Sequence, residues 1–349
     1  MMKLVALTDY KGRFGSKHFD SPYRSGMKKD QLVTVFHSFG IELCFVPMNK
    51  AWDCFPKDAT YFIYTGIEDQ GYLYKSFIED VVLGLTQMGK VALPDYMHLR
   101  ANNNKVVMEF LRRNTCKPFM NTIQTRFYGA LEELKRDIGD VTYPAVIKKA
   151  AGASGRGVFK AIDESDLISK SSKASSSVSW LWDLKDFIRG LRHRGYMRDS
   201  KNRNKFIIQN FIPNLKNDWK VYWFNGEMYV FYRPVFAHRD FIASGGGYDN
   251  YFYDEDAHKP DGFFEFAEEV MSCFKVPHAS MDIAFDGERY HLIEIQFLFF
   301  GTAGIPYSKG FYRKENDKWI FMNERREIEY VYAKSMAVFL NNEAEGTFC

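Results

Sequence analysis

The 349-residue sequence predicts an α/β region followed by a region of mixed α+β structure. Apolar runs of strand and helix length alternate over residues 1–100, which indicates a parallel sheet covered by helices. Further along, the dipeptides Asn225-Gly226 and Asp286-Gly287 separate segments rich in aromatic and β-branched residues. Such dipeptides are typical of tight hairpin turns, so antiparallel hairpins are expected there.

The composition indicates a globular chain with large cores, because 46% of the residues are hydrophobic and 17% are aromatic. The length suggests two or three domains. The 47 basic and 44 acidic residues leave a net charge of only +3. We therefore expect neither a nucleic-acid partner nor a membrane partner.

Cysteines and apolar runs bear on the cellular compartment. The five cysteines form an odd number with no Cys-x-x-Cys pair, which argues against a disulfide framework or a zinc site. No segment approaches the roughly 18 consecutive apolar residues that a membrane span requires. The sequence therefore predicts a soluble, cytoplasmic protein.

Hydrophobic periodicity predicts the elements of a first domain, residues 1–100. Four short apolar runs are expected to be buried strands, and two longer amphipathic runs to be helices. The expected strands cover residues 3–9, 41–48, 60–66 and 90–95, and the expected helices cover 29–39 and 72–88.

Two further helices are expected outside this domain. Val106, Phe110 and Leu111 follow helical spacing in the middle of the chain, and residues 330–342 form a closing helix. Between residues 164 and 205 lies an insertion that begins rich in serine and ends strongly basic. Its basic run, residues 189–198, is ordinarily a solvated helix face, and a binding site is the alternative.

A glycine-rich stretch, Gly152 to Gly157, follows a strand that ends in Lys148 and Lys149 and precedes a second strand. It is neither a Walker P-loop nor a Rossmann fingerprint, because its glycine spacing differs from both and a strand follows it. Small residues let a backbone approach a ligand closely, and exposed N–H groups beside a lysine suit a phosphate. The stretch therefore points to a nucleotide, with an ordinary glycine-rich hairpin as the alternative.

The second expected hairpin carries polar residues where a strand is otherwise apolar. Glu294 and Gln296 alternate with isoleucines on the returning strand, and Asp282 can face them from the partner strand. A carboxylate in such a strand is costly unless it is paired or bound to a cation. Two carboxylates and an amide oxygen suit Mg²⁺ held jointly with ATP phosphates, whereas a polar outer face of the hairpin is the alternative.

Together, these motifs resemble the ATP-grasp superfamily in order and spacing. The resemblance rests on five segments: Asn104-Lys105 before a helix, PAVIKKAAGASGRGV, IIQNFIPN, DWKVYWFNGEMYVFYR and the D-x(11)-E-x-Q hairpin. It implies an ATP-grasp fold with a Rossmann-like first domain and two α+β subdomains that clamp ATP. The implied boundaries are residues 1–100, 101–205 and 206–349.

The resemblance also implies roles for individual residues. The implied ATP-binding residues are Lys105, Lys148, Gly152, Ser154, Gly155, Arg156, Gly157, Gln209, Asn210, Phe211 and Ile212, with Asp218 at the ribose or the acceptor. The last four of the first group, Gln209 to Ile212, would bind adenine through backbone groups. The implied catalytic residues are Lys220, Arg233 and Arg239. Asp282, Glu294 and Gln296 would hold Mg²⁺, as two ions, with Mn²⁺ as an alternative.

The sequence departs from the family pattern at the substrate end. Members usually carry E-x-N followed two residues later by arginine, whereas this chain has Gln296 and Leu298 at those places. The missing arginine is expected to come from elsewhere, and Arg239 is the candidate. It precedes a second glycine-rich loop, residues 244–247, which resembles an acceptor-binding loop of related ligases.

The activity that the resemblance implies is ATP- and Mg²⁺-dependent carboxylate–amine ligation. An acyl phosphate would form and then give an amide or peptide bond, with release of ADP and phosphate. The expected partners are a small carboxylate and an amine, and the family often forms homodimers. Two alternatives stay open: a kinase that phosphorylates a hydroxyl, and an ATP-binding module without chemistry.

Overall fold

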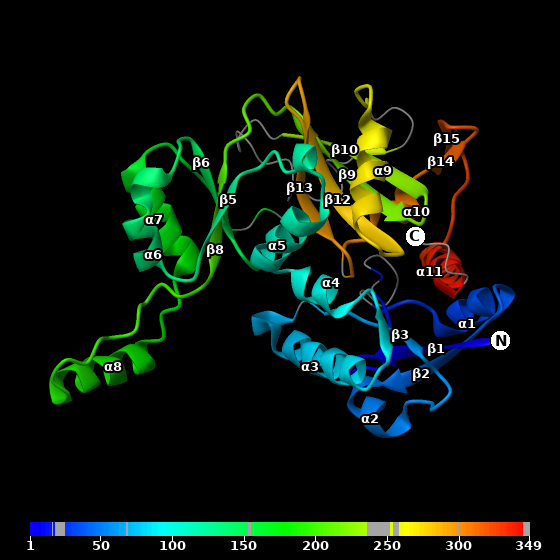
Figure 1. Cartoon of the computed structure of the whole chain (residues 1–349), viewed down its shortest axis with the longest axis horizontal. Coiled ribbons are helices and arrows are strands. Elements are labelled where there is room, and N and C mark those ends of the chain that lie inside the picture. The colour runs from blue at the N-terminus through cyan, green and yellow to red at the C-terminus, as the bar shows by residue number, and fades with distance from the viewer. Residues whose placement is uncertain are drawn as a thin grey trace.

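The computed structural model describes residues 1–15, 17, 25–67, 69–152, 155, 157–235, 252–253, 258–298 and 300–344. Ser154, Arg156, Arg239 and the expected acceptor loop at 244–247 therefore lie outside the described residues. The described chain forms three sheets with helices packed around them, which confirms the mixed α/β architecture (Figure 1).

The first sheet is built from the N-terminal part of the chain, as expected. Its strands are all parallel and lie in the order β2-β1-β3-β4. The strands are β1 (Met2–Thr8), β2 (Ile41–Pro47), β3 (Tyr61–Tyr64) and β4 (Val91–Leu93), and the helices are α1 (Lys29–Ser38), α2 (Ala51–Cys54), α3 (Leu73–Gln87) and α4 (Tyr96–Ala101). The expected strands and helices of this region are thus confirmed within a few residues.

The second sheet is small and antiparallel. Its strands are β5 (Thr125–Tyr128), β6 (Ala145–Lys149), β7 (Val158–Ala161) and β8 (Phe206–Asn210), in the order β5-β8-β6-β7. It packs against α6 (Leu131–Arg136) and α7 (Glu164–Ser175). The glycine-rich stretch joins β6 to β7 as expected, with Lys148 opposite Val158. Because β8 pairs with both β5 and β6, a subdomain boundary after Asn210 fits the structure better than one at residue 206.

The third sheet is the largest and contains both expected hairpins. Its main path is β13-β12-β9-β10-β14-β15, and β11 pairs with β10. The strands are β9 (Asn217–Phe224), β10 (Glu227–Pro234), β11 (Phe252–Tyr253), β12 (His278–Phe285), β13 (Tyr290–Gln296), β14 (Phe311–Glu315) and β15 (Lys318–Met322). Asn225 and Gly226 both have positive φ, at 44° and 88°, as the tight turn between β9 and β10 requires.

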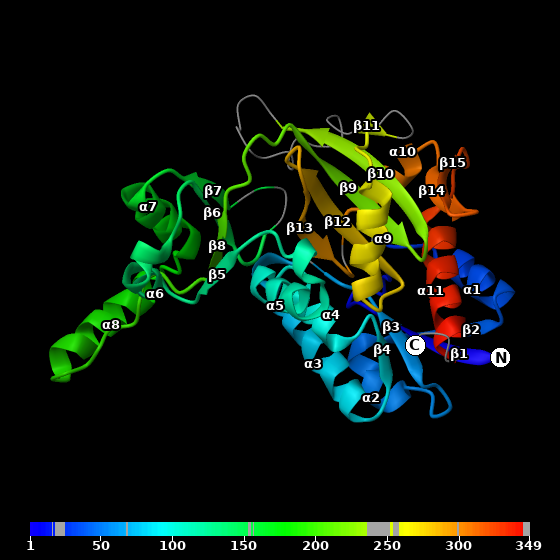
Figure 2. The ribbon, with the colours of Figure 1, turned by 45° about the horizontal axis from the view of Figure 1, so that its top comes forward.

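Helices connect the large sheet to its neighbours. Helix α5 (Lys105–Thr115) lies between the small and large sheets, and α9 (Phe263–Cys273) lies along the large sheet (Figure 2). The short helix α10 (Gly304–Tyr307) follows β13. Helix α11 (Ile328–Ala344) is the expected closing helix, and it packs against α1 of the first domain. The first domain, the large sheet and α11 thus share one hydrophobic cluster, while the small sheet has its own.

One helix stands apart from these layers. Helix α8 (Trp180–Arg192) lies within the expected insertion and projects from the small sheet, away from the large sheet, in both ribbon views (Figures 1 and 2). In the part of the chain that the structure describes, no helix has the length and apolar character needed to cross a membrane.

Candidate active site

Lys105 lies at the start of α5, where the helix meets the glycine-rich stretch and the large sheet. Its backbone N–H donates to the carbonyl of Ala150 at 2.8 Å, and its Nζ donates to the carbonyl of Gly152 at 3.2 Å. The same Nζ lies 3.0 Å from Oε1 of Glu294. One side chain therefore joins the loop after β6 to a carboxylate on β13, between the two sheets.

The three predicted metal ligands lie on neighbouring strands. Asp282 on β12 pairs directly with Glu294 on β13, and Ser280 pairs with Gln296. Directly opposed residues of an antiparallel pair share a face, and so do residues two apart on one strand. The structure therefore brings the two carboxylates and the amide together, and their metal binding stays a prediction.

Asp282 belongs to a buried network of charges on β9, β10 and β12. Arg233 donates from Nε and Nη2 to the two carboxylate oxygens of Asp218, at 2.6 and 2.7 Å. Arg233 Nη2 also lies 3.1 Å from Asp282, and Lys220 Nζ lies 2.9 Å from the other oxygen of Asp282. Burial alone would raise the pKa of Asp282, but Arg233 and Lys220 outweigh burial and hold that pKa below its usual value.

This network defines what Arg233 does in the structure. Its side chain is only 3% exposed, and it neutralises two buried aspartates at once. A buried carboxylate needs such a partner, because an unpaired charge in the interior is strongly unfavourable. Contact between Arg233 and a transferred phosphoryl group stays a prediction, since its guanidinium already binds Asp218 and Asp282.

Lys148 differs from the other cations of the site. Within the described ranges, no hydrogen bond or ion pair engages its Nζ, in contrast to Lys105, Lys220 and Arg233. Burial lowers the pKa of Lys148 to about 8, although the nearby Glu294 opposes this shift. Lys148 is thus the cation of this cluster that remains available for an anionic ligand such as a phosphate.

The pKa of Lys148 leads to a prediction about pH. Below pH about 8 the ammonium is protonated and attracts phosphate, and above that value it is increasingly neutral. We therefore expect the KM for ATP to rise as the pH is raised through this value. Initial rates measured across the pH range test this. The Lys148→Arg variant keeps its charge to far higher pH, so this rise should vanish in that variant. An unchanged rise in the variant would contradict the assignment.

The glycine-rich stretch has the backbone that its sequence predicts. Gly152, Gly155 and Gly157 all have positive φ, at 135°, 68° and 87°. At Gly157 a Cβ atom would lie 2.8 Å from Cδ of Lys149, so the aliphatic chain of that lysine occupies the space that any larger residue needs. A phosphate-binding role of these glycines stays a prediction.

The predicted adenine-binding segment, Gln209 to Ile212, begins at the end of β8, and its first residue has a structural role. The Gln209 side chain is buried and donates to Glu109 at 3.1 Å and to Thr125 at 3.0 Å. The N–H groups of Asn210 and Phe211 already donate to the carbonyls of Gln124 and Pro144. These two N–H groups are therefore not free for adenine here, so the carbonyls of the segment and Ile212 are the better candidates.

Sequence reasoning missed two parts of this site. The first is the buried pair of Glu109 and Arg112, whose carboxylate and guanidinium are 2.5 Å apart. Their helical spacing from Lys105 places all three on one face of α5, which is a detectable signal. The second is the pairing of Asp218 with Arg233. Those two residues lie opposite each other across the hairpin turn at Asn225-Gly226, so counting outward from the turn would have found it.

The donor set suits the predicted Mg²⁺ ions. Asp282, Glu294 and Gln296 offer carboxylate and amide oxygens on one face of the hairpin, and such hard oxygen ligands are those that Mg²⁺ prefers. Lys105, Lys220 and Arg233 neutralise these carboxylates in the structure and would share them with a metal. Among the described residues, no group of three or more His, Cys, Asp or Glu side chains is placed to hold a metal. The fit therefore depends on Gln296 and on ATP oxygens as further ligands.

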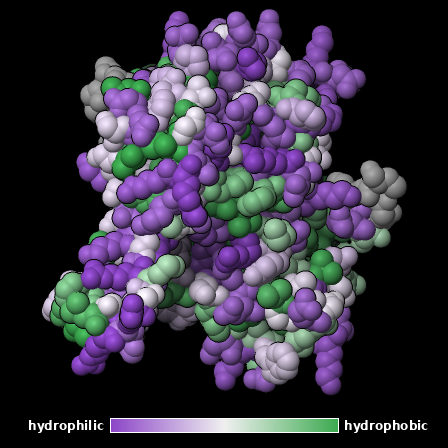
Figure 3. All heavy atoms as spheres, turned by 60° about the vertical axis from the view of Figure 1, so that its left-hand side comes forward, coloured by the Kyte–Doolittle hydropathy of each residue, from purple (hydrophilic) through white to green (hydrophobic). Residues whose placement is uncertain are grey.

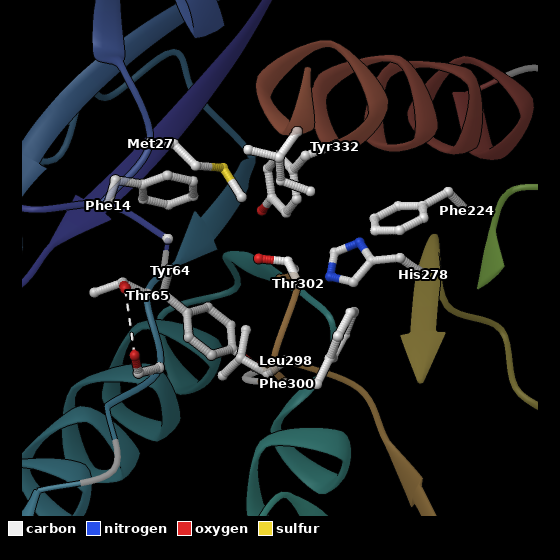
Figure 4. A pocket seen from close by; sticks show the side chains of 13 residues that line it. Phe14, Met27, Tyr64, Thr65, Phe224, His278, Leu298, Phe300, Thr302 and Tyr332 are labelled. Atoms are coloured by element: carbon white, nitrogen blue, oxygen red, sulfur yellow. Dashed lines mark hydrogen bonds between the residues drawn. The ribbon is translucent and has the colours of Figure 1, made fainter. Parts of the chain in front are cut away.

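A small cavity lies beyond the end of β13, between the first domain and the large sheet (Figure 4). Its volume is about 30 Å³, and its walls include Tyr64, His278, Leu298, Thr302 and Tyr332. Nδ1 of His278 is buried without a hydrogen bond to any described residue, and burial lowers the pKa of this histidine to about 3. The cavity therefore presents a neutral imidazole beside Leu298, where the family pattern has an arginine.

Solved structures share the fold of this protein over nearly the whole chain. D-cycloserine synthetase DcsG has a TM-score of 0.56 at 11% identity, with 97% of this chain and 99% of that chain covered. A RiPP-associated ATP-grasp ligase of Chryseobacterium gregarium has a TM-score of 0.52 at 12% identity, with 98% and 97% covered. D-alanine–D-alanine ligase from Bacillus anthracis has a TM-score of 0.51 at 13% identity, with 99% and 100% covered.

The chain has the ATP-grasp fold. No family model matches the sequence, and no curated protein is similar to it at the sequence level. The likeness is therefore one of structure, and it confirms the resemblance that the five motifs indicated. In this ATP-grasp fold, Lys148 lies on the small sheet, and Asp282 and Glu294 lie on the large sheet.

Proposed function

We propose that the protein is an ATP-dependent carboxylate–amine ligase. The observation that carries the proposal is Lys148, a half-buried lysine whose Nζ forms no ion pair with any described residue, although two carboxylates lie nearby between the two sheets. A triphosphate with its metal ions would supply negative charge for Lys148 and positive charge for Asp282 and Glu294. The ATP-grasp fold supports this proposal, because two structural neighbours are named as ligases, one of them solved with ADP, and a third is named as a synthetase.

The proposed reaction has two steps. A carboxylate oxygen of the first substrate attacks the γ-phosphorus of ATP, the bond to the β,γ-bridging oxygen breaks, and ADP leaves. The amine then attacks the acyl carbon, phosphate leaves with the electrons of the C–O bond, and the nitrogen loses a proton to give the amide. Bound Mg²⁺ would neutralise charge on the phosphates.

The residues of the chain have distinct tasks in this scheme. Lys148 offsets the charge that the transferring phosphoryl carries, which is the main demand of phosphoryl transfer. Lys105 holds the loop after β6 next to Glu294, so phosphate contacts on the small sheet stay aligned with the carboxylates of the large sheet. Arg233 and Lys220 keep Asp282 ionised and oriented. An acyl phosphate reacts with water, so the Gly152–Gly157 loop would close over it.

The acceptor site is proposed to include the cavity beside Leu298. It adjoins the end of β13, where Glu294 and Gln296 lie, and it offers His278 and Thr302 as polar contacts. At about 30 Å³ it has room for little more than a water molecule, so it would take a small substituent of the acceptor. Amino acids and peptides fit the names of the structural neighbours, one of which was solved with a leader and core peptide. A cytoplasmic location and a homodimer remain predictions.

An assay for acyl phosphates tests the proposal. The protein is incubated with Mg-ATP, pooled carboxylates and hydroxylamine, and the products are analysed for ADP and for hydroxamates by mass spectrometry. We expect ADP together with a hydroxamate whose mass names the carboxylate. ADP with a phosphorylated metabolite and no hydroxamate would replace the ligase by a kinase, which Leu298 at the family's arginine position makes the second candidate. No ADP with any pool would contradict both enzymes.

A further inference from the structure

Helix α8 exposes an unusual amount of apolar surface. Seven of its large hydrophobic side chains are between 40% and 72% exposed: Trp180, Leu181, Trp182, Leu184, Phe187, Ile188 and Leu191. Met197, just beyond the helix, is 87% exposed. Figure 3, in which the side of the molecule that carries α8 comes forward, shows a cluster of hydrophobic side chains at its lower left. Apolar groups in such density usually mark a contact surface.

Six of these seven exposed side chains lie on one side of the helix. At 100° per residue, Trp180, Leu184, Phe187, Ile188 and Leu191, together with Leu181, fall within an arc of about 120°. We call these six residues the α8 apolar face. Lys185, Arg189 and Arg192 follow one another along the edge of this face next to Leu181. The helix is therefore amphipathic, although the face that a globular protein would bury points into solvent.

The opposite side of α8 is fixed to the chain that follows it. Asp186 is the buried residue of the helix, and it accepts hydrogen bonds from Tyr196 Oη at 2.6 Å and from the N–H of Asp199 at 3.2 Å. The guanidinium of Arg198 lies 4.5 Å from the ring centre of Phe187. The returning segment thus holds α8 mainly by its polar side. Of the α8 apolar face it contacts Phe187 through Arg198, and Phe187 stays 44% exposed.

The segment around the helix carries a strong positive charge. Residues 176–205 contain eight lysines and arginines but three aspartates, which gives a net charge of +5. The whole chain has a net charge of +3, so the remaining residues together are slightly negative. A partner for this segment should therefore be negatively charged as well as apolar.

We propose that the α8 apolar face docks on an anionic phospholipid bilayer. Interfacial helices combine Trp, Phe and Leu on one face with Lys and Arg on the other, and they lie in the headgroup region without crossing it. With 13 residues, α8 is too short to span a bilayer. The helix projects from the small sheet, away from the large sheet (Figure 2).

Two other occupants fit the structure less well. A second copy of α8 would bring two segments of charge +5 together, and their repulsion opposes association. An acidic peptide ordinarily binds in a groove or along a sheet edge, whereas α8 offers an isolated convex helix. The lipid surface accommodates both the shape and the charge.

Vesicle sedimentation with the full-length protein tests the proposal. Vesicles of phosphatidylcholine with phosphatidylserine are compared with vesicles of phosphatidylcholine alone. We expect binding to the anionic vesicles, weaker binding to the neutral ones, and loss of binding as salt screens the charges. Leu184→Ser with Leu191→Ser should reduce the partition coefficient on the order of tenfold or more, because two apolar side chains no longer enter the lipid. Arg189→Glu with Arg192→Glu should reduce it by a similar factor.

A matched control uses another exposed tryptophan. Trp52 on α2 is 73% exposed, close to the 72% of Trp180, but it lies in the first domain. Trp180→Ser should weaken vesicle binding, and Trp52→Ser should leave it unchanged. No binding of the unaltered protein to anionic vesicles would overturn the proposal. So would self-association in analytical ultracentrifugation that the Leu184→Ser, Leu191→Ser variant abolishes, since α8 would then belong to an interface between copies.

Discussion

Replacing Lys148 by alanine is expected to reduce ATP-dependent turnover on the order of 10²–10³-fold, the usual effect of removing one group that stabilises transition-state charge. Lys148 is the cation of the site whose Nζ binds no described residue, whereas Lys105, Lys220 and Arg233 are already engaged by carboxylates. The loss should appear in the rate of ADP release at saturating acceptor. The melting temperature should change little, because removing this half-buried lysine breaks no ion pair with a described residue.

The adjacent lysine provides the control for this experiment. Lys149 also lies on β6, but its side chain is exposed and points to the other face of the strand. Lys149→Ala should retain nearly full activity. Equal losses of activity in both variants would show that β6 tolerates no substitution. Full activity of Lys148→Ala would show that Lys148 has no role in the reaction.

Replacing Arg233 by alanine is expected to destabilise the protein by about 3–5 kcal/mol, the typical cost of breaking a buried ion pair from one side. The variant would leave Asp218 with no guanidinium and Asp282 with Lys220 as its counter-ion. Denaturant unfolding at neutral pH measures the effect. The loss should shrink when Asp218→Asn is added, because the second substitution removes one of the two stranded charges.

A surface pair of the same residue types separates this effect from the loss of any arginine. Arg126 and Asp140 approach to 3.4 Å with exposed side chains. Arg126→Ala should change the free energy of unfolding by no more than ~1 kcal/mol, as is usual for exposed pairs. If Arg233→Ala is as stable as Arg126→Ala, the two buried aspartates must become hydrated or protonated when the guanidinium is removed, which would contradict the prediction.

Local signals in the sequence predicted much of the fold. The Asn-Gly and Asp-Gly turns fixed two hairpins, and once each turn is known, alternation along the strands determines which side chains share a face. That is why the proximity of Asp282 to Glu294 was predictable, as was a glycine-rich connection between β6 and β7. The parallel first sheet followed from alternating strand and helix periods.

Other features depend on contacts that no local pattern reveals. Strand β5 has four residues and is defined by its pairing with β8, far along the chain. Gln209 lies in a segment whose backbone was expected to bind adenine, but its side chain is buried against Glu109 of α5. The net charge of the whole chain also does not reveal the positive charge of residues 176–205, because it averages this segment with a slightly negative remainder.

The hydrophobic clusters determine which part of the molecule is able to move. The first domain, the large sheet and α11 are packed into one unit, whereas the small sheet has a separate core. The chain connects the two through residues 116–124 and 211–216, and α5 bonds to the small-sheet region through Lys105 and Glu109. We expect the small sheet to rotate as a rigid unit relative to the first domain, the large sheet and α11. Lys148 lies on the small sheet and would move with it, whereas the cavity beside Leu298 would stay with the first domain and the large sheet. In the proposed ligase, rotation of the small sheet toward the large sheet would bring the phosphates of ATP close to the bound acceptor.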